Sequence, residues 1–313
     1  MNQQRRVACR DVSDSGAALV EAIAQLAAEA SIEINVHEIR DLRAGRAFLG
    51  SGRKVYVSHP PRQTWQDTEA ACRAVRDAGF DPVPHVPVRL LADAETLDRL
   101  LAALAADAQV REVLLIAGDH PEPVGPFLTV SDVLRTGALR SHGLTRVSVA
   151  GHPEGHPKLT LDEIRRWERR KVALAVEAGL EVTVVTQFFF DHSPFLDWVR
   201  DLRLQGVRAR IVAGLAGPAG LATLFRFALR CGAGPSIRAL GARPKSMSKL
   251  ISDHGPEQLI RALAQARGAG EADFSGIHLF SFGGYLRTCD WLRQVADGRF
   301  SLNERGGFDV QSG

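Results

Sequence analysis

The sequence has few cysteines and no long apolar run. Its four cysteines are far apart and form no C-x-x-C pair, so they predict neither a zinc site nor a disulfide framework. No segment approaches the roughly eighteen uncharged apolar residues that a membrane helix needs, and the first residues lack the apolar core of a secretion signal. We therefore expect a soluble protein in the reducing environment of the cytoplasm.

The chain also lacks an excess of either charge. Its 39 basic and 36 acidic residues are interspersed and give a net charge of +3. There is no basic stripe with interleaved aromatic residues, the pattern that is typical of nucleic-acid binding. Neither nucleic acid nor a membrane is an expected partner, and assembly of identical chains into a homo-oligomer stays open.

Short apolar runs alternate with longer segments of helical periodicity. Eight runs rich in β-branched residues predict strands at 31–36, 54–58, 82–88, 112–118, 146–151, 181–190, 207–214 and 276–282. The segments between them predict helices, including 65–78, 94–106, 161–178, 194–204, 221–229 and 257–265. An open doubly wound sheet would normally have a G-x-G-x-x-G motif after its first strand, and no such motif follows the first run here. The repeated strand-then-helix units therefore predict a closed (β/α)8 TIM barrel.

The chain fits a single barrel domain, because 313 residues with 45% apolar content are within the usual size of this fold. An N-terminal extension and an extra helix occupy 1–30, with the helix itself predicted at 16–30. The barrel occupies 31–296, and a C-terminal tail follows at 297–313. The long interval between the seventh and eighth runs predicts two helices.

Polar residues cluster where the predicted strands end, and a (β/α)8 barrel builds its active site at the C-terminal ends of its strands. These residues include Glu33, His85, Asp119, His152 and Gln187. The H-x-x-x-H spacing of HPEGH does not predict a metal site, because two turn-forming residues intervene and no helical period puts both rings on one face. For each lone histidine, a hydrogen-bonded structural ring is the alternative.

Two segments resemble the methylenetetrahydrofolate reductase family. VSVAGHPEGHP at 147–157 is similar to the family's fifth-strand motif, and VTQFFFD at 185–191 to its sixth-strand motif. Weaker similarities follow the same order at 31–34, 83–85, 117–121 and 277–282. The resemblance implies a flavoenzyme of one-carbon metabolism and methionine biosynthesis that binds FAD non-covalently and is reduced by NADH or NADPH. It would transfer hydride to 5,10-methylenetetrahydrofolate to give 5-methyltetrahydrofolate, or run in the oxidative direction, since one site serves both directions.

The resemblance also implies two catalytic residues. Glu33 falls at the family's general acid, which delivers the proton that lets the imidazolidine ring open to an iminium ion. Desolvation between Ile32 and Ile34 would raise its pKa, whereas pairing with an arginine in a polar layer is the alternative. Asp119 matches an aspartate beside the flavin and the folate, where its charge would stabilise the iminium ion; a helix N-cap is the alternative.

Ligand contacts are implied in the same way. For the folate substrate they are Gln187, Phe189 and Arg287. For FAD they are Ser58, His85, Gly118, Asp119, Ala150, His152 and His156. Arg170 and Lys171 resemble a basic pair that meets the FAD diphosphate, although an exposed helical face explains this pair equally well.

Several positions depart from the family pattern. Ala117 stands where arginine is common, His152 replaces a tyrosine, and Gly283 and Gly284 replace an asparagine–arginine pair. Arg287, about one helical turn further on, is expected to restore the charge for the glutamate tail of the folate. The departures favour one alternative function, a non-catalytic barrel that binds folate or a partner subunit. An unrelated barrel aldolase would need a lysine at a strand end for a Schiff base, and no strand end has a suitable one.

Overall fold

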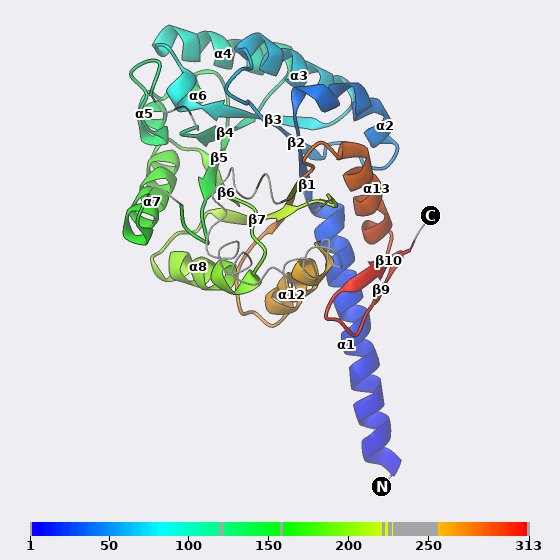
Figure 1. Cartoon of the computed structure of the whole chain (residues 1–313). Helices are drawn as coiled ribbons and strands as arrows, with labels where there is room; N and C mark the ends of the chain where they lie inside the picture. The colour runs from blue at the N-terminus through cyan, green and yellow to red at the C-terminus, as the bar shows by residue number, and fades with distance from the viewer. Residues whose placement is uncertain are drawn as a thin grey trace.

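The computed structural model describes residues 2–118, 120, 122–156, 159–220, 223, 224, 227 and 256–311, with side chains from residue 16 onward. In this part of the chain eight parallel strands close into a barrel in sequence order (Figure 1). They are β1 (Ser31–Ile34), β2 (Lys54–Val57), β3 (Asp81–Pro87), β4 (Glu112–Ile116), β5 (Arg146–Gly151), β6 (Glu181–Thr186), β7 (Arg210–Ala216) and β8 (Gly276–Phe280). The eight predicted strands and the (β/α)8 fold class are confirmed.

Helices form an outer layer around the strands (Figure 1). The α-helices are α1 (Asn2–Glu29), α2 (Leu42–Arg46), α3 (Trp65–Asp77), α4 (Ala94–Asp107), α5 (Val130–Arg135), α6 (Ala138–Ser141), α7 (Leu161–Glu177), α8 (His192–Leu204), α12 (Glu257–Gly268) and α13 (Tyr285–Ala296). Two 3-10 helices, η1 (Val36–Asp41) and η2 (Val88–Leu90), follow β1 and β3. The predicted helix at 221–229 lies largely outside the described residues.

Capping boxes fix where several helices begin. At the start of α3, Thr64 Oγ1 accepts from the backbone N–H of Asp67 and the Asp67 carboxylate accepts from that of Thr64. Thr160 and Glu163 repeat this arrangement at the start of α7. Each box satisfies backbone donors that have no partner within the helix, so these short sequence signals set the helix boundaries.

Strand alternation divides the apolar side chains between two cores. Residues that point outward, such as Ile32 and Val55, pack under the helices in the main core. A smaller cluster that points inward fills the middle of the barrel and contains Tyr56, Val83, Leu114 and Val185. The barrel is therefore a packed structure and not a pore.

The amino-terminal end of the barrel interior is closed by a polar network. The Glu112 carboxylate accepts hydrogen bonds from Lys54 Nζ at 2.6 Å and Ser148 Oγ at 2.7 Å, and lies 3.4 Å from Arg146 Nε. The Tyr56 hydroxyl lies 3.0 Å from Ser148 Oγ. Glu112 is only 2% exposed, so these contacts replace the water that its charge has lost.

Helix α1 and a hairpin near the carboxyl terminus both contact α12 and α13. Helix α1 starts well before the predicted 16–30 and contacts α12, α13 and β8. The segment expected as a C-terminal tail contains an antiparallel hairpin of β9 (Phe300–Leu302) and β10 (Phe308–Val310). Phe308 packs against Phe300 and Trp291, which attaches this hairpin to α13.

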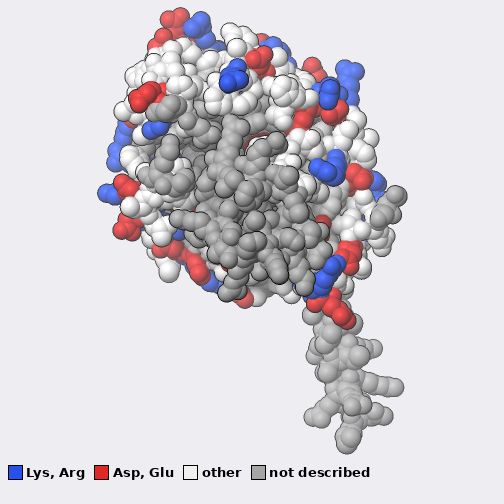
Figure 2. Space-filling model, viewed as in Figure 1, with Lys and Arg blue, Asp and Glu red and all other residues white. Residues whose placement is uncertain are grey.

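The described surface agrees with the charge pattern of the sequence. On the face shown in Figure 2, basic and acidic side chains alternate without a large patch of one sign. Among the described residues, no helix combines the length and apolar character that crossing a membrane requires.

Candidate active site

The carboxyl-terminal half of the barrel interior is open to solvent. Side chains that point inward there are partly exposed, namely Glu33, Ser58, Ile116, Ala150, Gln187, Val212 and Phe280. Below them Tyr56, Leu114 and Val185 are buried. We call the region lined by these partly exposed side chains the well, and it lies where a (β/α)8 enzyme binds its ligands.

Glu33 lies at the floor of this well between two histidines. Its Oε2 atom is 3.4 Å from Nε2 of His85 on β3 and 3.9 Å from Nε2 of His278 on β8. Burial raises the pKa of Glu33, although a charge on His85 would lower it. Among the described residues no arginine pairs with Glu33. A carboxyl group in this setting keeps its proton to higher pH than an ordinary glutamate, so it is suited to donate one.

The two histidines are held in different ways. His278 Nδ1 lies 2.9 Å from Ser31 Oγ, and its ring meets Tyr56 edge-on at 4.7 Å. His85 Nε2 is buried without a hydrogen-bond partner among the described residues. Burial lowers the pKa of both rings, and that of His278 to about 3. Both rings are therefore neutral near pH 7, and neither compensates a charge on Glu33.

A second buried carboxylate near the well has a structural role. Glu38 accepts hydrogen bonds from the backbone N–H groups of Asn35 and Tyr285 and from the Ser281 hydroxyl. These contacts join η1 to the connection between β8 and α13. Burial raises the pKa of Glu38 while the hydrogen bonds lower it. Because its oxygens hold backbone groups, Glu38 is a poor candidate for proton transfer.

Two predicted flavin contacts lie at the ends of β2 and β4. The Ser58 hydroxyl donates to the Ile34 carbonyl at 3.0 Å and remains partly exposed. Gly118 has a φ of +88°, and a Cβ there would lie 2.8 Å from Cβ of Pro87. Only glycine fits this position without strain. Asp119, the predicted second catalytic residue, lies outside the described residues.

The loop after β5 carries His152 and His156 and is anchored by Glu168 of α7. The Glu168 carboxylate accepts from the His152 backbone N–H at 2.7 Å, the Trp198 indole at 2.9 Å and Arg165 at 3.2 Å. Burial raises the pKa of Glu168, but the bonds from His152 and Trp198 lower it overall. The rings of His152 and His156 meet edge-on at 5.6 Å. The sequence did not reveal Glu168, because its partners come from another strand end and another helix.

The predicted basic pair is divided by the helix. Lys171 Nζ donates to the Ala150 carbonyl at 2.7 Å, at the end of β5. Burial lowers the pKa of the Lys171 ammonium, and Glu168 opposes this shift. Arg170 is exposed on α7. The structure therefore brings Lys171 to the strand end that carries Ala150, and leaves Arg170 on the helix surface.

The three phenylalanines after β6 face different cores. Phe189 is 1% exposed and stacks on Phe195 at 4.9 Å, so its ring lies in the main core under α8. This placement does not support the predicted contact of Phe189 with the substrate. Phe188 points inward and meets Phe280 at 5.6 Å. Gln187 is partly exposed at the same strand end, and its side-chain oxygen accepts from the Phe188 N–H.

The connection after β8 holds an unusual backbone conformation. Phe282 has a φ of +50°, in the left-handed region that residues with a Cβ rarely adopt, and its ring contacts Phe188 at 5.2 Å. Such strain is concentrated at functional sites. Beyond it, Arg287 is exposed on the first turn of α13, and its Nη2 lies 2.7 Å from where a Cβ of residue 284 would be. Gly284 thus leaves the space that this guanidinium occupies.

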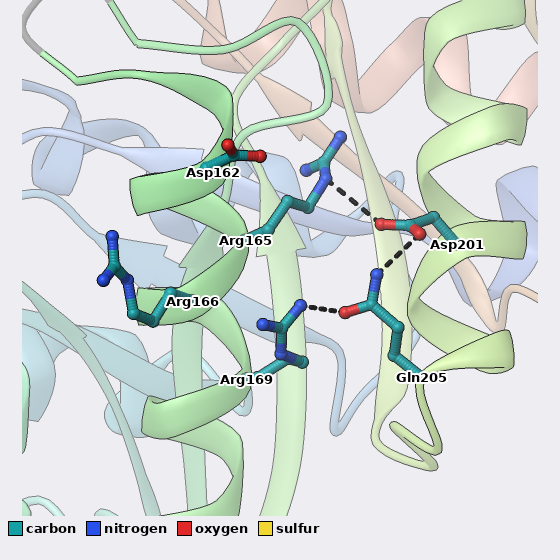
Figure 3. A pocket seen from close by; sticks show the side chains of 6 residues that line it. All are labelled: Asp162, Arg165, Arg166, Arg169, Asp201 and Gln205. Carbon is teal, nitrogen blue, oxygen red and sulfur yellow. Dashed lines mark hydrogen bonds and ion pairs between the residues drawn. The ribbon is translucent and has the colours of Figure 1, made fainter.

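A separate groove lies outside the barrel between α7 and α8 (Figure 3). Arg165 lies 3.4 Å from Asp201 across it, and Arg169 donates to Gln205. These guanidinium groups already have partners on the facing helix, and the groove is formed by the outer helical layer. We therefore assign the candidate site to the well at the strand ends.

Comparison with known proteins points to one family. A family model described as methylenetetrahydrofolate reductase matches residues 61–234, more than half of the chain. Methylenetetrahydrofolate reductase (NADH) 1 from Arabidopsis thaliana is 29% identical over 134 residues, which are 39% of this chain and 22% of that protein. Methylenetetrahydrofolate reductase 2 from Saccharomyces cerevisiae is 26% identical over 112 residues, 34% of this chain and 18% of that protein. The matched part of the chain thus spans only about a fifth of each relative.

A solved structure from Clostridium thermocellum has a similar fold. It superposes with a TM-score of 0.54 over 84% of this chain and 92% of that one, at 11% identity. That protein is described as uncharacterized and as binding two copies of 5-methyl-5,6,7,8-tetrahydrofolic acid. The family match itself covers β3 to β7 and leaves out β1 and β8, which carry Glu33 and His278.

Proposed function

Because the chain belongs to the methylenetetrahydrofolate reductase family, we propose that it transfers hydride between FAD and a one-carbon folate. The observation that carries this proposal is Glu33, a carboxyl group with a raised pKa at the floor of an open well. Reduction of 5,10-methylenetetrahydrofolate to 5-methyltetrahydrofolate consumes a proton as well as a hydride, because one ring nitrogen leaves as an amine. A protonated carboxyl group inside the site meets that requirement.

Glu33 is the proposed general acid. In the reductive direction it donates its proton to the leaving nitrogen, so that the opened ring presents an electrophilic methylene carbon. In the oxidative direction its carboxylate accepts the proton from that nitrogen, since the same site stabilises one transition state both ways. Asp119, next to Gly118 in the sequence, is proposed to stabilise the positive charge of the iminium ion.

The residues at the strand ends fit a flavin. Ser58 and Ala150 are partly exposed there, and Gly118 has no side chain to keep a flat ring away from its backbone. FAD, when bound, would supply or accept the hydride. Ser58, Gly118 and Ala150 would line its ring system, His85 would lie beneath it, and Lys171 would face the diphosphate. His152 and His156 would extend this lining along the loop that Glu168 anchors.

The opposite side of the well fits a folate. The Gln187 amide can both donate to and accept from the edge of a pterin ring. The partly exposed Phe280 provides an apolar wall, with the buried Phe188 packed behind it, in place of the predicted Phe189. Arg287 at the rim would bind the carboxylates of the glutamate tail. NADH is the proposed electron donor, supported by the name of the Arabidopsis relative.

Flavin binding provides the first test. Titration of the purified chain with FAD should quench flavin fluorescence with one-to-one saturation in the micromolar range. Anaerobic addition of 5-methyltetrahydrofolate or NADH should then bleach the flavin absorbance. Absence of saturable FAD binding would contradict the proposal. Calorimetric binding of 5-methyltetrahydrofolate without FAD would then favour the second candidate, a non-catalytic folate-binding barrel, which Ala117 and His152 in place of arginine and tyrosine already suggest.

A further inference from the structure

His85 is directed at Glu33 from below the rim of the well. The residue is 9% exposed, and its Nε2 atom is buried without a hydrogen-bond partner among the described residues. The nearest acid atom is Oε2 of Glu33, at 3.4 Å. A buried polar atom without a partner costs free energy, so a native protein that keeps one calls for a functional explanation.

The other titratable groups near His85 are less suited than Glu33 to exchange a proton with it. His278 approaches from β8, but Ser31 holds its Nδ1 and burial lowers its pKa to about 3. Tyr56 on β2 meets the His85 ring edge-on at 6.2 Å, and burial raises the pKa of its hydroxyl. Burial lowers the pKa of His59, after β2, to about 4. Glu33 is therefore the facing group whose pKa burial moves toward the neutral range and not away from it.

We propose that His85 is the proton-exchange partner of Glu33 and restores its protonation state after each turnover. This inference rests on the proposed function. In the reductive direction the O–H bond of Glu33 breaks and an N–H bond forms on the substrate, which leaves a carboxylate. The new negative charge favours a protonated ring, so His85 takes up a proton from water on Nδ1 and gives the one on Nε2 to Glu33. The ring then returns to its starting tautomer by exchanging protons with water, before the next turnover. No electrons move in this step, and the net change is one proton taken from solvent.

Tyr56 lies beside both histidine rings of the site. Its ring contacts both His85 and His278, and its hydroxyl lies 3.0 Å from Ser148 Oγ. Tyr56 therefore links the two histidine rings to the polar network below the well. The exchange needs only a proton transfer over the short gap to Glu33, without movement of the backbone.

The kinetic test separates the first turnover from later ones. In His85→Gln, one turnover of reduced enzyme with 5,10-methylenetetrahydrofolate should keep its rate within about two-fold, because Glu33 has already equilibrated its proton with solvent before mixing. Steady-state kcat should fall by at least about ten-fold, with KM unchanged, since loss of an acid–base group commonly costs more than this. His59→Gln, a matched change at another buried histidine, should alter neither rate. Equal losses in both phases of His85→Gln, or no loss in either, would overturn the proposal.

The second test does not depend on turnover. In protein with ¹⁵N-labelled histidine, Glu33→Gln should lower the pKa of His85, because the carboxylate that favours the charged ring is gone. The titration of His59 should stay the same. An unchanged His85 titration would overturn the pairing even if folate is reduced. If wild type turns over no folate, the proposed function fails, while this titration still decides whether the two groups are coupled.

Discussion

Two glutamates inside the same barrel show opposite solutions to the burial of a carboxyl group. Glu112, at the amino-terminal end, has Lys54, Arg146 and Ser148 around it. Glu33, on β1 and nearer the carboxyl ends of the strands, faces two neutral rings at 3.4 and 3.9 Å. Both side chains point inward from β-strands, so strand alternation treats them alike. The difference lies in what the neighbouring strands supply.

That difference separates structural from chemical carboxyl groups. A charge that is fully paired is costly to move and changes its protonation state only with loss of stability. A carboxyl group without a compensating charge has a raised pKa and a proton available for transfer. Glu38 combines features of both: burial raises its pKa, but its oxygens hold backbone N–H groups and are not free for proton transfer. The comparison therefore yields distinct expectations for substitutions at the two ends of the barrel.

Glu33→Gln should produce the largest effect. Hydride transfer to 5,10-methylenetetrahydrofolate should fall by about 10²–10⁴-fold, the usual loss for a missing general acid, while reduction of the flavin by NADH survives. Glutamine keeps the size and hydrogen bonding of the side chain and removes only the acid proton. Stopped-flow absorbance can follow each half-reaction separately, through bleaching and re-oxidation of the flavin. An equal loss in both half-reactions would indicate a damaged flavin site and break the comparison.

Glu112→Gln should show the reverse pattern, with lost stability and intact chemistry. The change leaves the ammonium of Lys54 beside a neutral amide, and Lys54 is partly exposed. We therefore expect the free energy of unfolding to fall by about 3 kcal/mol, at the lower end of the cost of breaking a buried ion pair. Urea unfolding followed by circular dichroism would measure it. Glu181→Gln, at an exposed position of β6, is the control and should change stability by less than about 0.5 kcal/mol.

Much of the fold could be predicted from local sequence patterns, but the hairpin near the carboxyl terminus could not. The strands were predictable because runs such as VLLI, at 113–116 in β4, are continuously apolar, as buried parallel strands are. Capping residues such as Thr64 and Thr160 made the starts of α3 and α7 equally clear. The hairpin of β9 and β10 was missed because each strand has three residues, too few for a periodic pattern.

The sequence predicted which strand ends form the candidate site, but not which side chains contact one another there. The resemblance implied a substrate contact for Phe189, but β6 ends at Thr186 and Phe188 turns inward instead. The approach of His85 and His278 to Glu33 joins β1, β3 and β8, which are far apart in the sequence. Barrel closure creates this contact, and no local pattern encodes it.

Lowering the pH should reduce the stability of the folded chain, because His59 and His278 are buried as neutral rings. Burial lowers the pKa of His59 to about 4 and of His278 to about 3, whereas an unfolded histidine titrates near 6.5. The unfolded chain binds these protons first, so stability falls as the pH drops from about 6.5 toward 4. Each ring should lower the free energy of unfolding by about 2 kcal/mol at pH 5 relative to pH 7.

Glu33 and Glu38 act in the opposite sense, because their raised pKa values make the folded chain bind protons first. The measurement is therefore the difference in urea stability between wild type and His59→Gln at pH 7 and at pH 5. The variant should lose about 2 kcal/mol less than wild type between these values. Parallel losses in the two proteins would mean that His59 is protonated in the folded state.

Substitution of Arg287 at the rim should have the smallest effect, because an exposed charge can act on the reaction only through binding. Arg287→Ala should raise KM for the folate by about five- to ten-fold, about 1 kcal/mol, and leave kcat unchanged, as expected for an interaction equally strong in the ground and transition states. Gly284→Ala tests the position of the same guanidinium. The added Cβ would lie 2.7 Å from Arg287 Nη2, so the flexible side chain of Arg287 has to move aside. This substitution should raise KM by a smaller factor, whereas Arg99→Ala, exposed on α4, should change nothing. A fall in kcat for Arg287→Ala would mean that the rim takes part in the chemistry assigned to Glu33.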